Sequence, residues 1–242
     1  MMKKIIFALF ASLLLNTGLF AQAQLTEEVK KKTPELPGQI MVDFGFNSVT
    51  DNPSNLPYHW WRSKSLGVYF IKSYEFSKKF ELRPGIGINF EKFGHSDNMK
   101  VFAYGEDASG ADTLGFATVL GGSLKKNQLA VNYVEIPVEV RFNFNGNEKK
   151  DGIFIAVGGS AAFRLESHTK LKYTDEFGKK MKTKQKNDFG LNRIRLGAHG
   201  KLGYRSFSLF YKTYFTNVFS GSGPIGTSDM LYSTIGVSLT GL

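Results

Sequence analysis

The chain has 242 residues, with 26 Gly, 22 Phe, 7 Pro and no Cys, and its formal net charge is +10. The lack of cysteine excludes disulfides, zinc–thiolate sites and a lipid-bearing cysteine. Glycine and aromatic residues in this proportion favour closely packed strands over helices.

Residues 1–23 are predicted to form a secretory signal peptide. Lys3 and Lys4 precede an apolar run, Ile5–Leu15, and residues 21–23 are Ala-Gln-Ala, the small–x–small pattern that precedes a cleavage site. The alternative is an N-terminal anchor helix, but the apolar run is shorter than the ~20 residues that span a bilayer. Cleavage would remove the two lysines and lower the net charge from +10 to +8.

The chain from residue 24 to residue 38 is polar and cannot bury an apolar face. We expect a flexible periplasmic N-terminal tail. Beyond it, apolar residues alternate with polar or small residues, the period of a strand. The pattern predicts about eight strands, several of them about ten residues long, enough to cross a bilayer at a tilt. The expected strands cover 40–47, 66–71, 80–91, 134–144, 153–166, 193–204, 206–215 and 231–239.

The face opposite the apolar one decides the fold class. It carries glycine and charges of both signs, whereas a water-facing sheet carries scattered Lys, Ser and Thr. The charged positions are Asp43, Glu81, Glu91, Glu135, Glu139 and Glu166, with Arg83, Arg141, Arg164, Arg193, Arg195, Lys201 and Lys212. The numbers of acidic and basic side chains on this face are nearly equal. This suits a narrow closed lumen, because an unpaired buried charge costs several kcal/mol.

We therefore predict an all-β fold: an eight-stranded antiparallel up-and-down transmembrane β-barrel over residues 39–242, with long extracellular loops. The apolar side chains would face lipid. The predicted lumen ionic network comprises Glu81, Arg83, Glu135, Glu139, Arg141, Arg164, Glu166, Arg193, Arg195 and Lys201. Candidate interfacial aromatic residues are Tyr58, Trp60, Trp61, Tyr204, Tyr211 and Tyr214. The alternative is a secreted sandwich or lipocalin-like barrel with its apolar face inward.

The connections differ in length in a way that supports the barrel. Short turns are expected at 73–79, 145–151 and 203–206, and longer loops at 49–63, 94–127, 173–187 and 217–229. In outer-membrane barrels the short turns are periplasmic and the long loops extracellular. Within the second long loop, 99–104 and 113–120 are candidates for the strands of a hairpin.

Several strands resemble those of a known family. The sequence of residues 132–138, NYVEIPV, resembles the YxEIP strand of the PorT-type outer-membrane β-barrel proteins common in Bacteroidota. Residues 82–88 resemble the preceding strand of that family, and 155–160 the glycine-rich strand that follows. The resemblance implies an outer-membrane location and, because the namesake group includes accessory proteins of a secretion system, a role of that kind. Independently of it, Pro137 predicts a bulge or local edge, since proline cannot donate to a ladder.

Catalytic and metal-binding patterns are weak. No two of the four histidines, at positions 59, 95, 168 and 199, stand at metal-ligand spacing. The candidate sets are His95 with Ser96, and Ser167 with His168 and Glu166. In each set the serine and the histidine are adjacent, so on a strand they point to opposite faces. Glu135 and Glu139 share a face with Arg141, which favours an ionic network over acid–base chemistry. We expect no enzyme and no cofactor.

Residues 170–186 contain seven lysines. Lys179, Lys180, Lys182 and Lys184 are candidate contacts to anionic lipopolysaccharide, and the alternative is a solvated loop. We expect outer-membrane lipid and lipopolysaccharide as partners, with an envelope protein as a further candidate, and no nucleic acid, because no recognition helix or RNA-binding strand is evident. The predicted role is that of a scaffold or interaction protein. The alternatives are a narrow pore or small-solute binder, and a lipid-modifying enzyme.

Overall fold

The computed structural model describes residues 38–50, 59–95, 100–106, 112–118, 123–145, 152–175, 177–220 and 230–241. The predicted signal peptide, the predicted tail up to residue 37, and Tyr58 lie outside the described residues.

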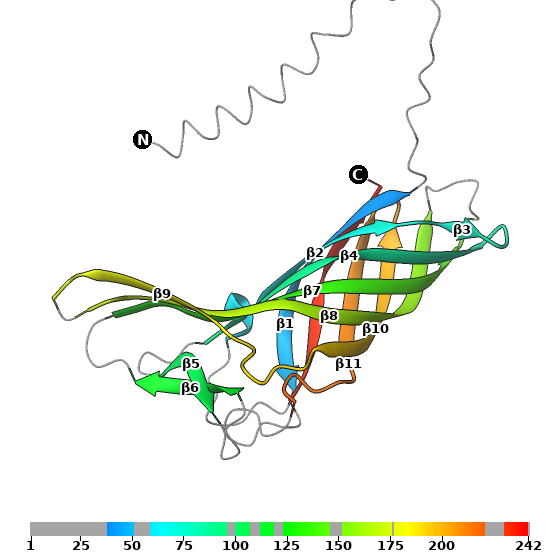
Figure 1. The fold of residues 1–242 in the computed structure, drawn as a ribbon. Coiled ribbons are helices and arrows are strands. Elements are labelled where there is room, and N and C mark those ends of the chain that lie inside the picture. Colours follow the sequence, from blue (N-terminus) through cyan, green and yellow to red (C-terminus); the bar gives the residue numbers. More distant parts are fainter. Residues whose placement is uncertain are drawn as a thin grey trace, which may run out of the picture. The chain divides into compact units, whose positions relative to one another are not determined.

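Eight long strands form a closed antiparallel ring (Figure 1). In chain order they are β1 (Gln39–Thr50), β2 (Lys64–Ile71), β4 (Phe80–Gly94), β7 (Ser123–Asn143), β8 (Ile153–Thr174), β10 (Ile194–Tyr204), β11 (Phe207–Tyr214) and β12 (Leu231–Thr240). The ring closes because β12 pairs with β1 and β8 pairs with β10. The eight-stranded barrel predicted from the sequence is confirmed. Closure leaves no sheet edge in the hydrocarbon, where an unpaired backbone group would cost several kcal/mol.

The remaining elements are short. β3 (Tyr74–Glu75) pairs with β4, and β9 (Lys180–Lys186) pairs with the end of β8. The short 3-10 helix η2 (Trp60–Arg62) precedes β2. β5 (Lys100–Glu106) and β6 (Asp112–Thr118) form a separate antiparallel pair, as the sequence predicts for this loop. Among the described residues no helix is both long and apolar enough to cross a bilayer.

The apolar side chains point away from the barrel axis. Phe44 is 41% exposed and Ile88 is 42% exposed, while Arg195 is fully buried. The orientation is the reverse of a soluble sandwich, whose apolar face would be covered. The prediction is therefore confirmed for the outward-facing series, whereas Ile71, Phe154 and Phe210 are on the inward-facing series and are buried.

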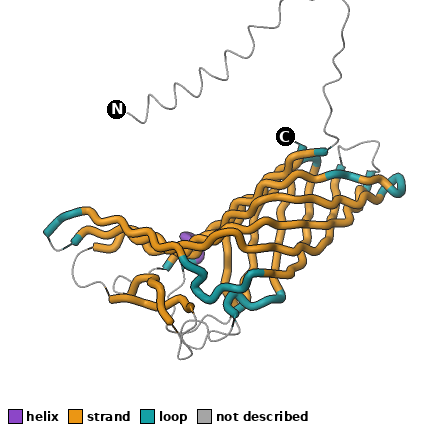
Figure 2. The backbone as a smooth tube through the Cα atoms, in the orientation of Figure 1, coloured by secondary structure: helices purple, strands orange, loops and turns teal. Residues whose placement is uncertain are grey.

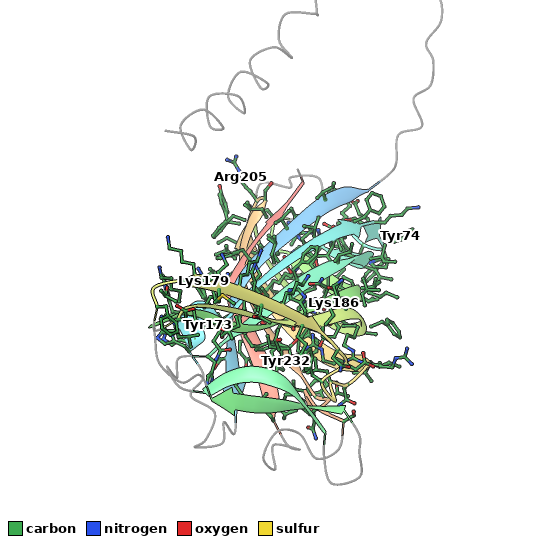
Figure 3. All side chains as sticks on the ribbon, turned by 60° about the vertical axis from the view of Figure 1, so that its left-hand side comes forward. Tyr74, Tyr173, Lys179, Lys186, Arg205 and Tyr232 are labelled. Atoms are coloured by element: carbon green, nitrogen blue, oxygen red, sulfur yellow. The ribbon has the colours of Figure 1, made fainter. Side chains whose placement is uncertain are left out.

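The two ends of the barrel differ. The strand ends that flank the short connections from β2 to β4, from β7 to β8 and from β10 to β11 gather at one end, which also holds the start of β1 and the end of β12 (Figure 2). Tyr74 and Arg205 mark this end, and Tyr232 lies toward the other (Figure 3). By the rule for outer-membrane barrels, the short-turn end is periplasmic and the long-loop end is extracellular.

Pro137 interrupts one ladder. The pairing of β4 with β7 runs through Pro84 and Val138, has a gap, and resumes at Gly87 and Glu135. Pro137 is one of the two β7 residues within this gap, and it has no N–H to donate. The local edge expected from its position in the sequence is present.

β7 and β8 are longer than their apolar alternation predicts, with 21 and 22 residues. Beyond the ring the start of β7 and the end of β8 stay paired with each other, and β9 adds a third strand to form an extension at the long-loop end (Figure 1). Outside the hydrocarbon, pairing maintains a strand without an apolar face, which is why residues 123–128 and 180–186 gave no strand signal in the sequence.

A β-bulge separates the barrel part of β8 from the extension. Tyr133 pairs with Arg164 and Asn132 pairs with Glu166, so Leu165 is an extra residue. A bulge shifts the facing of every later side chain. Ala156 and Ala162 are buried before it, and Ser167 and Thr169 are buried after it. Glu166 therefore faces outward, and its expected place in the lumen network was wrong.

We predict that the purified protein, folded in detergent, shows heat-modifiable mobility. Without boiling, a closed ladder of backbone bonds resists dodecyl sulfate, so the compact barrel should migrate faster on a gel than the boiled chain. Equal mobility before and after boiling, in a sample that circular dichroism shows to be rich in strand, would contradict a closed barrel.

Candidate functional site

The lumen contains a network of buried charges, and its extracellular part is built around Arg195 on β10 and Glu91 on β4. The Nη2 group of Arg195 lies 2.9 Å from Oε1 and 3.0 Å from Oε2 of Glu91. Asn89 donates to the same carboxylate at 2.9 Å, and the hydroxyl of Tyr232 donates to it as well. Both charges have no exposed side-chain surface. Their separation from water is tolerable only because they are paired and hydrogen-bonded.

Three tyrosine rings enclose the guanidinium of Arg195. Its central carbon lies 3.7, 4.3 and 4.5 Å from the ring centroids of Tyr133, Tyr214 and Tyr232. Contact with the negative faces of aromatic rings stabilises a desolvated cation by about 2 kcal/mol. The cage therefore favours the charged form of Arg195 in addition to the carboxylate.

Glu135 on β7 is the centre of a second cluster. Lys212 on β11 lies 2.8 Å from its Oε1, and the hydroxyl of Tyr69 donates to its Oε2 at 2.7 Å. Asn89 also donates to Oε2 of Glu135, at 3.2 Å, so this one amide joins the Glu91 and Glu135 clusters.

Glu139 holds a third cluster nearer the periplasm. Arg83 donates to Oε1 at 2.8 Å, while His199 and Lys201 each lie 3.2 Å from Oε2. Gly158 makes room for this carboxylate, because a Cβ there would lie 2.3 Å from the carbonyl oxygen of Val138 and 2.8 Å from the Cβ of Glu139.

The periplasmic end of the lumen is polar as well. Arg141 donates through Nε to Asn143 at 2.8 Å, and Asn143 donates to Glu81 at 2.6 Å. The guanidinium of Arg141 lies 3.6 Å from the ring centroid of Phe154. The network therefore continues from the extracellular Glu91 cluster to this end.

The structure brings seven of the ten predicted network residues into the lumen: Glu81, Arg83, Glu135, Glu139, Arg141, Arg195 and Lys201. Two of the other three lie outside the lumen, Arg193 and Glu166. Arg193 precedes β10 and is exposed. Arg164 is on the inward-facing series of β8 before the bulge, its side chain is 6% exposed, and it pairs with Asp188 of the following loop at 3.2 Å. Glu166 lies beyond the bulge and pairs with Lys186 of β9 at 3.1 Å.

The predicted network left out several residues that complete it. Alternation had placed Glu91 and Lys212 on the inward-facing side, but they were not named in the network, in which they carry opposite charges; Tyr69, Tyr133 and Tyr232 line it. Tyr214 was expected at the membrane interface but is buried in the lumen. Tyr214 and Lys212 are two residues apart on the same strand, so their side chains point to the same face. That spacing is the sequence signal for its place in the lumen. Trp60, Trp61, Tyr204 and Tyr211 are each more than half exposed.

The sets considered for catalysis are not assembled as a nucleophile and base. His168 lies 3.4 Å from Glu166, but the Ser167 hydroxyl donates to the Asn187 carbonyl at 2.5 Å and belongs to the opposite, buried face. Ser96 lies outside the described residues. Within the described part of the chain, no three His, Asp or Glu side chains lie together as metal ligands would.

A groove of about 830 Å³ opens on the outer face near the extracellular end. Its apolar part includes Phe44, Leu66 and Phe90, and its cationic part is formed by Arg62, Lys64, Lys92, Lys125, Lys126 and Lys170. The four lysines predicted to contact lipopolysaccharide do not line it. Lys179 lies near the tip of the extension, with Lys180, Lys182 and Lys184 along β9 (Figure 3).

The fold and its sidedness define an integral β-barrel protein of the outer membrane, with charged residues inside and apolar residues toward lipid. Residues 20–222 match the family described as outer membrane protein beta-barrel domain, and the chain belongs to that family. No curated protein matches the sequence.

Solved barrels are similar over most of the chain. The crystal structure of Ail, the attachment invasion locus protein of Yersinia pestis, covers 84% of this chain and 97% of its own, with 12% identity and a TM-score of 0.35. Ail in complex with the heparin analogue sucrose octasulfate covers 85% and 99%, with 12% identity and a TM-score of 0.31. A triple mutant of the Rhodopseudomonas blastica porin covers 84% and 99%, with 11% identity and a TM-score of 0.19.

We predict that Arg195→Met destabilises the barrel by about 3–5 kcal/mol, because Glu91 is left buried without its cation. The double variant Glu91→Gln with Arg195→Met should recover most of this loss. Urea unfolding in micelles, followed by heat-modifiable mobility, measures both. Arg193→Met removes an exposed arginine and should change stability by less than about 0.5 kcal/mol. Equal effects of Arg193→Met and Arg195→Met would contradict a buried pair.

Proposed function

We propose that the protein is a non-conducting scaffold of the outer membrane, with no catalytic role. The observation that carries the proposal is the cross-lumen pairing. Arg195 on β10 and Glu91 on β4 are three strands apart around the ring, as are Lys212 on β11 and Glu135 on β7. Their side chains meet across the interior, where an eight-stranded barrel is only wide enough for side chains to fill.

The surface that the scaffold presents is the β7–β8–β9 extension. Sheet pairing ends at β9, whose seven residues are all exposed. Phe177 near the tip is 86% exposed. An edge strand offers unpaired N–H and C=O groups, to which an extended segment of another protein can add as a further strand. We propose that an envelope or surface protein binds here in this way.

The particular role we propose is that of an accessory in protein secretion. The support is the resemblance of residues 132–138 to the corresponding strand of PorT-type barrels, together with a filled lumen. A barrel that does not itself conduct suits an accessory that positions other components.

The first test is electrical. In planar bilayers the folded protein should produce no stable single-channel steps, because paired charges occupy the lumen. A variant that replaces Glu91, Glu135, Arg195 and Lys212 with alanine serves as the positive control and should pass ions. Stable steps from the unaltered protein would favour the alternative, a narrow pore.

The second test is for a partner. A photo-crosslinking amino acid at Met181 in β9 should capture an envelope or surface protein in cells, whereas the same group at Phe76 in a periplasmic turn should not. Both positions are exposed. Capture only from Phe76 would overturn the assignment of the extension, and capture from neither position would count against a scaffold.

A further inference from the structure

The lipid-facing side chains change character abruptly at the extracellular end. On β2 the outward series passes from Leu66 to Lys64, and on β4 from Phe90 to Lys92. Alternate residues along a strand are about 6.6 Å apart, so each strand passes from an apolar to a cationic side chain in one step. The groove lies across this boundary.

The cations are placed opposite one another. Lys64 lies directly opposite Lys92 in the pairing of β2 with β4. The extension contains further lysines that lie directly opposite one another. These pairs are Lys126 with Lys172, Lys170 with Lys184, and Lys172 with Lys182. Like charges directly opposite each other in a sheet are destabilising. An anion bound between these lysines would relieve the repulsion.

The described protein does not supply that anion within the groove. None of the described residues that line it is a carboxylate. The carboxylate nearest to it, Glu166 on the neighbouring part of β8, lies 3.1 Å from Lys186, 3.6 Å from Lys184 and 3.4 Å from His168, so this one negative charge is shared among three basic side chains. Partial burial, followed by the charges of Lys170, Lys92 and Lys172, lowers the pKa of Lys126.

The bulge at Leu165 helps to form this site. By shifting the facing of β8, it places His168 and Lys170 on the same outer face as Ala130 and Gln128 of β7. The groove has both of them in its wall. At the opposite wall, Lys64 Nζ lies 5.4 Å from the centroids of both the Phe46 and Trp61 rings, which hold the ammonium at the boundary.

We propose that this groove binds the phosphorylated headgroup of a glycolipid in the outer leaflet, with phosphate at Lys92, Lys126 and Lys170 and an acyl chain along Phe44, Leu66 and Phe90. A soluble anion would use only the cations, whereas a phosphorylated lipid matches both halves of the groove. The extracellular leaflet contains such a lipid in lipopolysaccharide. The proposal depends on the membrane orientation and not on the scaffold role or a protein partner.

The test uses the full mature chain in a non-ionic detergent with diphosphoryl lipid A as the probe, measured by native mass spectrometry. The triple variant Lys92→Gln, Lys126→Gln and Lys170→Gln should bind about a hundredfold more weakly, from roughly fivefold for each lysine near an anionic lipid. The matched control, Lys72→Gln, Lys78→Gln and Lys79→Gln, removes the same charge at the periplasmic end and should bind like the unaltered protein.

Heat-modifiable mobility establishes that both variants are folded, which is expected because none of the six lysines enters the lumen network. Inorganic pyrophosphate at the same concentration should not displace lipid A. Equal lipid A binding by the two triple variants would overturn the site, and displacement by pyrophosphate would assign the groove to a soluble phosphate compound in place of a lipid. Bilayer conductance and crosslinking from Met181 do not report on this site, so its failure is distinguishable from that of the scaffold.

Discussion

The pairing of charge inside a ring that faces hydrocarbon is the constraint on which the rest of this structure depends. Lipid provides no water for the backbone, so the sheet must close. Closure at eight strands leaves an interior that side chains must fill. Charged and polar side chains fill much of it, together with aromatic residues such as Tyr133 and Phe154. Glu91, Glu135 and Glu139 are tolerable there only with Arg195, Lys212 and Arg83 beside them.

Much of the fold could be predicted because alternate residues of a strand face opposite sides of the sheet, so the sequence itself shows which side chains share a face. Alternation identified the ring strands and placed Arg83, Glu139 and Arg195 on one face. The errors arose where this alternation of facing is interrupted. Leu165 adds one residue to β8, and no residue type signals that insertion, so Glu166 was assigned to the wrong face. Tyr214 shows a different difficulty, since tyrosine suits both an interfacial belt and a polar lumen.

The extension could not be predicted for a related reason. Within the membrane, strands show an apolar face, but outside it pairing alone maintains β7, β8 and β9. The cationic groove depends on neighbours that are distant in sequence. Lys64, Lys92 and Lys170 come from three strands, and only the register shows that they share a face. A count of charges indicated a basic protein without locating this cluster.

The position of the two tryptophans gives the molecule a built-in optical reporter. Trp60 and Trp61 are the only indoles in the chain, they adjoin each other in η2, and Trp61 lines the groove. Their rings are more than half exposed, and Trp61 stacks on Phe46 with centroids 5.1 Å apart. An occupant of the groove would change the polarity around these chromophores. Intrinsic emission therefore reports on one face of one end of the barrel, without a label and without background from the lumen.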